Sequence, residues 1–202
     1  MKNKKVQIKK ERVFKKKIDV VKNIREIMED IGEDVNREGL VETPKRVAKM
    51  YKEIFRGYDE KTKPKITTFS NENDKVSYDQ IIYDTGYFFS HCEHHMVPFF
   101  GQYHFAYIPG NRIVGLSKVA RIVDWHSAKL QIQERLVKDI VDDLEYALGN
   151  PVAIGLIMKG RHLCKEMRGV KKFNGAMITS DMRGAFRTKP EARAEFLKLT
   201  QI

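Results

Sequence analysis

The spacing of apolar residues changes along this chain from a period of two to a period of about 3.6, and this change constrains the fold most. Apolar and polar side chains alternate in Phe99–Ile108, as in a strand with one buried face. Val76–Phe89 also has the character of a strand, and we expect the two to form an antiparallel hairpin around a loop at Ser90–Pro98. From Leu116 to Leu148 the apolar residues recur at helical spacing, with a break predicted near Ser127–Lys129.

Two more strands and a closing helix are predicted after these helices. Val152–Met158 is almost wholly apolar, as expected of a buried strand, and Met177–Ser180 is a second candidate. Pro190–Leu199 is predicted to be a short helix. The order strand, strand, helix, helix, strand, strand predicts an α+β domain whose helices lie on one face of an antiparallel sheet.

The N-terminal part carries helix signals instead. Ile18–Ile31 places its apolar residues on one helical face and is followed by Gly32 as a stop. A second helix is predicted from Thr43-Pro44, with Thr as the N-cap and Pro at the first helical position. Its expected buried residues are Val47, Met50, Tyr51 and Ile54. Because residues 58–75 are polar and rich in turn formers, we divide the chain into a basic tail at 1–17, a helical segment at 18–75 and a catalytic domain at 76–202.

The net charge of the chain is unevenly distributed. The whole chain of 202 residues carries +11, and residues 1–17, with nine Lys or Arg and one Glu, account for +8 of it. The remainder is therefore only mildly basic, and the excess lies in a segment that we predict to be a disordered, solubilising arm. Binding of RNA or of an anionic surface through this arm is the alternative.

Composition also indicates where the protein works. No uncharged apolar run approaches the roughly 20 residues that a membrane span needs, and no apolar segment follows the Lys-rich start as in a signal peptide. Two cysteines are too few for a disulfide framework. A cytoplasmic protein is expected.

Potential metal ligands gather in two short segments. Three of the six histidines and one of the two cysteines lie in His91–His95, and the other cysteine lies in His162-Leu163-Cys164. Zinc takes thiolate and imidazole ligands, with three protein ligands and a water molecule in catalytic sites. The pattern favours a zinc site of two thiolates and one imidazole, against the alternative that both cysteines are ordinary core thiols.

Two other zinc classes do not fit. A zinc finger needs a C-x2-C pair, which the chain lacks. The zinc deaminase signature begins with H-x-E, as in His91–Glu93, but it also requires P-C-x-x-C, and the segment at Cys164 supplies only one of those two thiols.

A second group of residues suggests an anion site. Ser117 and Lys118 follow Gly115 at a predicted helix start, and Arg121 lies one turn further on. Backbone N–H groups at a helix start attract phosphate, and Arg168 and Arg46 could contribute further charge. Taken singly, each of these basic residues is more simply interpreted as a surface charge, as is the carboxylate of Glu134.

Several motifs together resemble those of the type I GTP cyclohydrolase family. They are TPKRVAKM at 43–50, CEHH at 92–95, GLSKVARIV at 115–123, QIQERL at 131–136, RHLCKEMRGV at 161–170 and MITSDMRGAF at 177–186. The resemblance runs from about residue 18 to residue 199. It implies that the protein converts GTP and water to 7,8-dihydroneopterin triphosphate and formate, for folate or another pterin pathway.

The resemblance also implies site roles, residue by residue. Cys92, His95 and Cys164 would bind Zn²⁺, and His94 and His162 would be the catalytic histidines. The substrate contacts would be Glu134 and Gln133 at the guanine, Ser117 near the ribose, and Arg46, Lys118, Arg121 and Arg168 at the triphosphate. His91, Arg183 and the pair Trp125-His126 depart from the family pattern without removing any assigned residue.

The family resemblance implies an assembly too. The tunnelling fold joins the antiparallel sheets of several subunits into a barrel ringed by helices, and two such rings stack as a homodecamer with active sites between subunits. Two alternatives stay open here: another enzyme of this fold that acts on a pterin or deazaguanine, and a zinc-stabilised nucleic-acid-binding protein.

Overall fold

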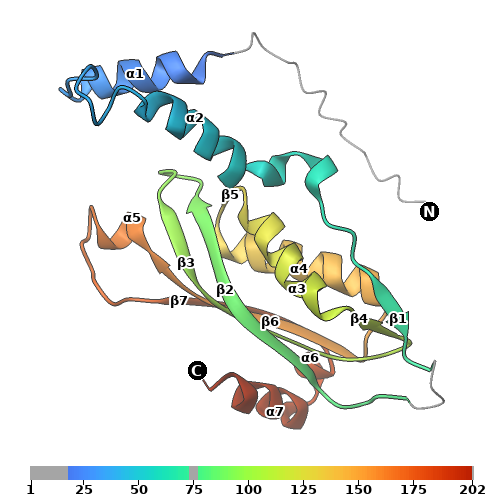
Figure 1. Ribbon diagram of the computed structural model, residues 1–202. Coiled ribbons are helices and arrows are strands. Elements are labelled where there is room, and N and C mark those ends of the chain that lie inside the picture. The colour runs from blue at the N-terminus through green and yellow to red at the C-terminus, as the bar shows by residue number, and fades with distance from the viewer. Residues whose placement is uncertain (1–17, 73–76, 202) are drawn as a thin grey trace, which may run out of the picture. The chain divides into compact units, whose positions relative to one another are not determined.

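A twisted sheet of five strands organises the computed structural model, which describes residues 18–72 and 77–201 (Figure 1). The strand order is β5-β2-β3-β6-β7. The strands are β2 (Ile82–Cys92), β3 (Pro98–Ile108), β5 (Leu130–Gln131), β6 (Ala153–His162) and β7 (Met177–Gly184). The four long strands pair antiparallel, whereas β5 adds a short parallel pairing to the end of β2. The predicted basic tail at 1–17 lies outside the described residues.

The hairpin of β2 and β3 is tighter than the sequence predicted. Ser90 and His91 pair with Phe99 and Pro98, so the predicted loop at Ser90–Pro98 shrinks to residues 93–97. Ser90 is buried, and its backbone continues the ladder although the polarity of its side chain suggested a turn. The shorter loop brings the His/Cys cluster directly onto the end of the sheet.

Two helices cover one face of the sheet, as predicted. α3 (Leu116–Ser127) and α4 (Gln133–Leu148) are separated near the expected break at Ser127–Lys129. Ile122, Ile140 and Leu144 are fully buried against the sheet. The strands contribute the side chains of one alternating set to this core, among them Phe88, Phe99, Phe105, Leu156 and Met158.

The closing helices lie on the other face of the sheet, which differs from the expected one-sided arrangement. The helices are α6 (Ala185–Thr188) and α7 (Pro190–Thr200). Ala106 of β3 packs with Phe186 of α6 and Phe196 of α7. Phe105, the residue before Ala106 in β3, belongs to the α3/α4 core. Successive strand residues point to opposite faces, so the two clusters are on opposite sides (Figure 1). Gly155 permits this packing, because a Cβ there would lie 3.0 Å from Phe196.

The polar segment before the sheet contains regular structure as well. It forms the 3-10 turns η1 (Arg56–Tyr58) and η2 (Glu60–Thr62) and the strand β1 (Thr68–Ser70), which pairs with β4 (Arg112–Val114). Trp125 of α3 donates its indole N–H to the Thr62 hydroxyl at 3.1 Å. Gly57 lies so close to the end of α3 that a Cβ would be 2.4 Å from the Trp125 carbonyl oxygen. This segment belongs to the compact unit from Lys52 onwards, which contains the sheet.

The other compact unit ends at Tyr51 and is helical, with α1 (Val20–Asp30) and α2 (Thr43–Ile54), whose last turn passes into the sheet unit. Met28 of the predicted apolar face is buried, but Ile31 is 73% exposed. The expected burial of Met50 is wrong, because its side chain is 43% exposed. Two short helices bury little surface between them, and Met28 is the one residue of α1 that is buried.

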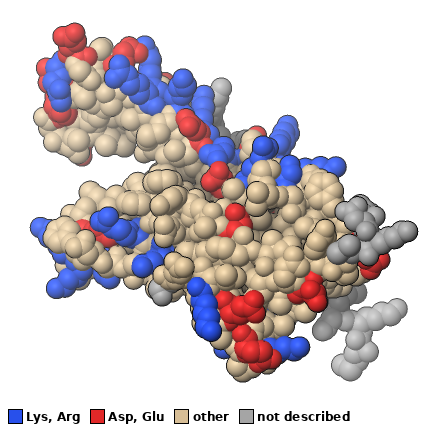
Figure 2. Space-filling view, turned by 60° about the horizontal axis from the view of Figure 1, so that its bottom comes forward, with Lys and Arg blue, Asp and Glu red and all other residues tan. Residues whose placement is uncertain are grey.

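Charged side chains of both signs are mixed on the visible face. Figure 2 shows Lys and Arg side chains, drawn in blue, along its upper edge with Asp and Glu side chains among them, and a broad uncharged area below them. In the part of the chain that the structure describes, no helix is both long and apolar enough to cross a membrane.

The α3/α4 core predicts a large effect for Leu144 and a small one for its neighbour on the same helix. Leu144 is fully buried and Tyr146 is 90% exposed. We expect Leu144→Ala to lower the free energy of unfolding by about 2–5 kcal/mol through lost burial and a cavity. Tyr146→Ala should change it by less than about 0.5 kcal/mol. Denaturant unfolding followed by circular dichroism would measure both, and equal effects would contradict this packing.

Candidate metal centre

A five-residue turn at the end of β2 positions the first ligand group. The amide N of Cys92 donates to the carbonyl of Val97 at 2.9 Å, and the amide N of Met96 donates to the carbonyl of Cys92 at 2.8 Å. Met96 closes the turn in the left-handed region, with φ of 57°. Glu93 ties the turn to β5 through its amide N, 3.1 Å from the carbonyl of Gln131. The turn therefore holds His94 and His95 at the sheet end.

The second ligand group arrives through the pairing of β3 with β6. Phe99, the second residue of β3, lies opposite His162, the last residue of β6. The chain then turns into α5 (Leu163–Glu166), which carries Cys164. Arg161 anchors this helix, since its guanidinium binds the buried carboxylate of Glu166 at 2.6 and 3.1 Å. Segments some 70 residues apart in the sequence thus meet at one sheet end.

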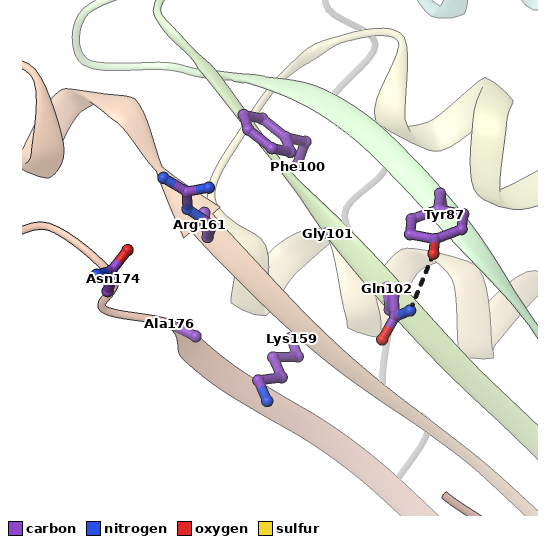
Figure 3. Close-up of a pocket in the computed structure, with 8 residues that line it drawn as sticks. All are labelled: Tyr87, Phe100, Gly101, Gln102, Lys159, Arg161, Asn174 and Ala176. Atoms are coloured by element: carbon purple, nitrogen blue, oxygen red, sulfur yellow. Dashed lines mark hydrogen bonds between the residues drawn. The ribbon is translucent and has the colours of Figure 1, made fainter.

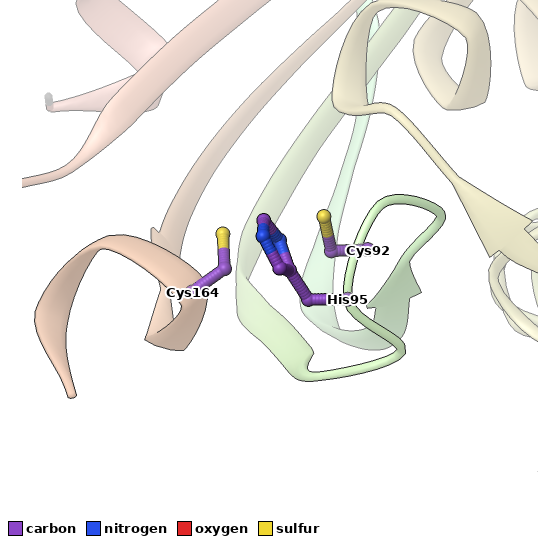
Figure 4. A group of neighbouring side chains, drawn as sticks. All are labelled: Cys92, His95 and Cys164. Carbon is purple, nitrogen blue, oxygen red and sulfur yellow. The ribbon is translucent and has the colours of Figure 1, made fainter. Parts of the chain in front are cut away.

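Cys92, His95 and Cys164 form a compact ligand group (Figure 4). One ligand atom from each lies within 4.8 Å of the other two. Burial and the nearby Cys92 thiol raise the pKa of Cys164, so two thiolates this close need a cation to compensate them. Two thiolates and one imidazole are a zinc donor set with room for a fourth ligand.

His91 is outside this group. Its ring packs edge-on against Phe55 with centroids 5.2 Å apart, and burial lowers its pKa. His94 lies beside the group, with Nδ1 3.5 Å from the Cys92 sulfur. Arg168 donates from Nη1 to Nε2 of His95 at 2.9 Å, so this predicted phosphate ligand lies at the metal centre.

His162 has a rigid setting. Its ring stacks on Phe99 with centroids 4.7 Å apart, and its Nε2 lies 2.9 Å from the side-chain oxygen of Gln133. Burial lowers the pKa of His162 more than the carboxylate of Glu134 raises it, so the neutral imidazole is favoured. Glu134 itself is exposed in the first turn of α4.

Gln133 fixes which nitrogen of His162 carries the proton. Its amide nitrogen lies 3.0 Å from each of three acceptors, the carbonyls of Met158 and Met177 and the hydroxyl of Thr179. Carbonyls only accept, so the amide must present its oxygen to His162. Nε2 of the imidazole therefore donates, and Nδ1 is left with a lone pair.

Gly160 makes room for this arrangement. A Cβ at this position would lie 2.4 Å from the Gln133 oxygen and 3.2 Å from the ring of Phe88. The sequence reasoning missed both the role of Gly160 and the burial of Gln133. Glycine inside a strand was the one available signal, because it often marks a close approach of another group.

The predicted phosphate and ribose residues on α3 lie away from the ligand group. The end of α3 at Ser127 leads into β5, which pairs with Cys92. Ser117 is ten residues before that end, or about 15 Å along the helix at a rise of ~1.5 Å per residue. Lys118 and Arg121 lie on the same half of α3, and Arg121 lines a separate hollow with Arg56 and Asp124. Arg46 is on α2, in the N-terminal unit.

Together the fold and the ligand group define an α+β protein with a Cys-His-Cys metal centre at one end of its sheet. Residues 20–201 match the family model described as GTP cyclohydrolase I, and the chain belongs to that family. The α+β fold and the family predicted from the sequence are thereby confirmed, and the cluster agrees with the zinc site of this family.

Relatives with similar sequences cover most of the chain. The GTP cyclohydrolase 1 of Caldanaerobacter subterraneus subsp. tengcongensis is 47% identical over 181 residues, 89% of this chain and 94% of its own. That of Deinococcus radiodurans is 46% identical over 179 residues, 88% of this chain and 81% of its own. Among solved structures, the apo form of the archaeosine synthase QueF-Like aligns with a TM-score of 0.42 and 15% identity, over 52% of this chain and 93% of its own.

The ligand group makes a prediction about zinc content. Cys164→Ser should lower bound zinc from one ion per chain to near zero, because a hydroxyl replaces a thiolate ligand. His91→Ala is the matched control within the histidine cluster, and it should keep full zinc because His91 lies outside the group. Metal analysis of both purified variants would measure this. Full zinc in Cys164→Ser, or loss in His91→Ala, would show that the ligands are assigned wrongly.

Proposed function

We propose that this protein converts GTP and water to formate and 7,8-dihydroneopterin triphosphate. The observation that carries the proposal is the Cys92/His95/Cys164 group beside the half-buried His162, in a chain that belongs to the GTP cyclohydrolase I family. Its relatives of that name are about as long as this chain, which favours the whole activity rather than a part of it.

The metal would be held by Cys92, His95 and Cys164. When bound, zinc supplies a water molecule whose pKa is lowered to about 7, which makes it a nucleophile at neutral pH. His94, next to the Cys92 sulfur, is positioned to assist activation of that water or a later proton transfer.

His162 would exchange protons with the purine. Addition of oxygen at C8 becomes easier when N7 gains a proton as the electrons arrive. Because Nε2 of His162 is committed to Gln133, Nδ1 is the atom at which that proton enters and leaves. Ring opening then breaks the C8–N9 bond, hydrolysis releases formate, and the ribose carbons close onto the freed amine.

The substrate contacts follow from the same proposal. Glu134 would accept the N1–H and the 2-amino group of guanine, a donor pair that adenine lacks. Ser117 would lie near the ribose, with Arg46, Lys118, Arg121 and Arg168 around the triphosphate. Gln133 would act on guanine only through His162, because both ends of its amide are already bound.

We infer that each active site contains residues from more than one chain. Ser117, Lys118 and Arg121 lie along α3 away from the metal ligands, so a second subunit would supply them to each site. Joining sheet edges between subunits would also cover the edge of β7. We therefore propose a barrel-shaped homo-oligomer, a homodecamer in this family, acting in the cytoplasm, where the two free cysteines stay reduced.

An assay with GTP tests the function directly. The zinc-loaded protein should release formate and give the ultraviolet band of a dihydropterin together, and a chelator should abolish both. Formate without the pterin band would mean that ring opening is intact and closure is lost. Zinc-loaded, assembled protein that releases no formate would contradict the proposal and favour a relative with another substrate. His162→Ala should retain zinc and release no formate.

Gln133→Met tests how Gln133 acts. The substitution removes the hydrogen bond that orients His162 and keeps the volume. We expect kcat to fall by about 10- to 100-fold, the value of one hydrogen bond at a reacting group, while KM for GTP changes little. Steady-state kinetics with zinc content as the control would separate the two parameters. A raised KM with unchanged kcat would show that Gln133 contacts the guanine itself.

A further inference from the structure

A cavity of about 390 Å³ opens on the face of the sheet that does not carry α3 and α4 (Figure 3). Its walls include Phe100 and Arg161, which alternate along their strands with Phe99 and His162 of the metal centre. Neighbouring residues of a strand point to opposite faces, so the cavity and the metal centre lie back to back. The proposed reaction uses none of the cavity's side chains.

Two aromatic rings form the apolar part of the cavity. Tyr87 is 69% exposed, a large aromatic surface left open to water. Phe100 is held from one side by Phe89, stacked with centroids 5.6 Å apart, and its ring also lies 5.9 Å from the Arg161 guanidinium carbon. The Gln102 amide fixes Tyr87 by donating to its hydroxyl at 3.3 Å. These rings are suited to stacking against a flat ligand.

The charged part of the cavity lies on β6. Lys159 and Arg161 are two residues apart and therefore on the same face. Nε and Nη2 of Arg161 are bound by Glu166, which neutralises that charge. Lys159 makes no ion pair within residues 18–72 and 77–201. The cavity thus has one uncompensated positive charge, with Asn174 as a further polar group at its rim.

We propose that this cavity binds a planar aromatic anion with a single anionic group, a carboxylate or a phosphate monoester. The ligand ring lies against Tyr87 and Phe100, and its anionic group pairs with Lys159. The volume suits one or two fused rings. A triphosphate does not fit this charge balance, because only one cation is free to receive it. The site is therefore distinct from the one proposed for GTP.

Arg161 connects the cavity wall with the helix that carries Cys164. The guanidinium lies at the cavity wall and also holds Glu166 on α5, two residues from Cys164. The ion pair between Arg161 and Glu166 thus connects the cavity with the metal centre, although the cavity lining contains none of the three metal ligands.

The test uses the purified, zinc-loaded protein and three matched probes. They are 2-naphthoate, 2-naphthyl phosphate and the neutral 2-naphthamide, and binding is measured by ligand-observed NMR. We expect at least one anion to bind with a Kd of about 1 mM or below and the amide at least about tenfold more weakly. The stronger of the two anions identifies the preferred group.

Two variants locate the binding. Lys159→Met should weaken the anion by about tenfold or more, as expected for one charge-assisted hydrogen bond, and leave the amide unchanged. Lys198→Met, an exposed lysine on α7 outside the cavity, is the control and should bind like the unmodified protein. Equal binding of amide and anions, an unchanged affinity in Lys159→Met, or no binding at about 10 mM would each overturn the proposal. None of these results depends on turnover of GTP, so failure here leaves the proposed function untouched.

Discussion

The register of β3 between β2 and β6 is the constraint on which the rest of the site depends. β3 pairs with both neighbours over almost its whole length. One ladder brings the turn with Cys92 and His95 to the sheet end, and the other brings His162 and Cys164 to the same end. A slip of one residue would turn Phe99 and His162 to the opposite face and separate the ligands. The metal centre is thus a consequence of strand pairing.

The helices on the sheet position a further part of the site, the Gln133 side chain beside His162. α4 is held on the sheet by a fully buried apolar face, and its first residue, Gln133, is thereby placed under β6. A buried amide must satisfy its donors and acceptor, and Gln133 does so with two strand carbonyls, a hydroxyl and His162. Gly160 leaves the space that this network needs. The packing of α4 therefore places the Gln133 amide, and the Gln133 amide in turn fixes which nitrogen of His162 carries the proton.

Sequence reasoning anticipated the features that repeat along the chain or cluster in it. The long strands and α3 and α4 have clear periods, and the Cys/His segments predicted a zinc site of two thiolates and one imidazole, in which the family resemblance alone selected His95. β5 was missed because a strand of two residues is too short to show a period. The position of α7 on the second face of the sheet depends on the packing of Phe196 with residues distant in the sequence, which the helical pattern does not reveal. The burial of Gln133 was equally hidden, since its contacts come from strands 25 to 46 residues away. Met50 was expected to be buried because it lies on the apolar face of an amphipathic helix. The helical pattern does not show whether another element covers that face, and Met50 is exposed.

X-ray absorption at the zinc edge of the purified protein would identify the ligands of the metal centre. A centre built from Cys92, His95 and Cys164 should show two sulfur ligands at about 2.3 Å and lighter nitrogen or oxygen ligands at about 2.0–2.1 Å for the remainder. That result would identify both cysteines and leave room for imidazole and water. Four sulfurs, a single sulfur or none would contradict a centre built from Cys92, His95 and Cys164.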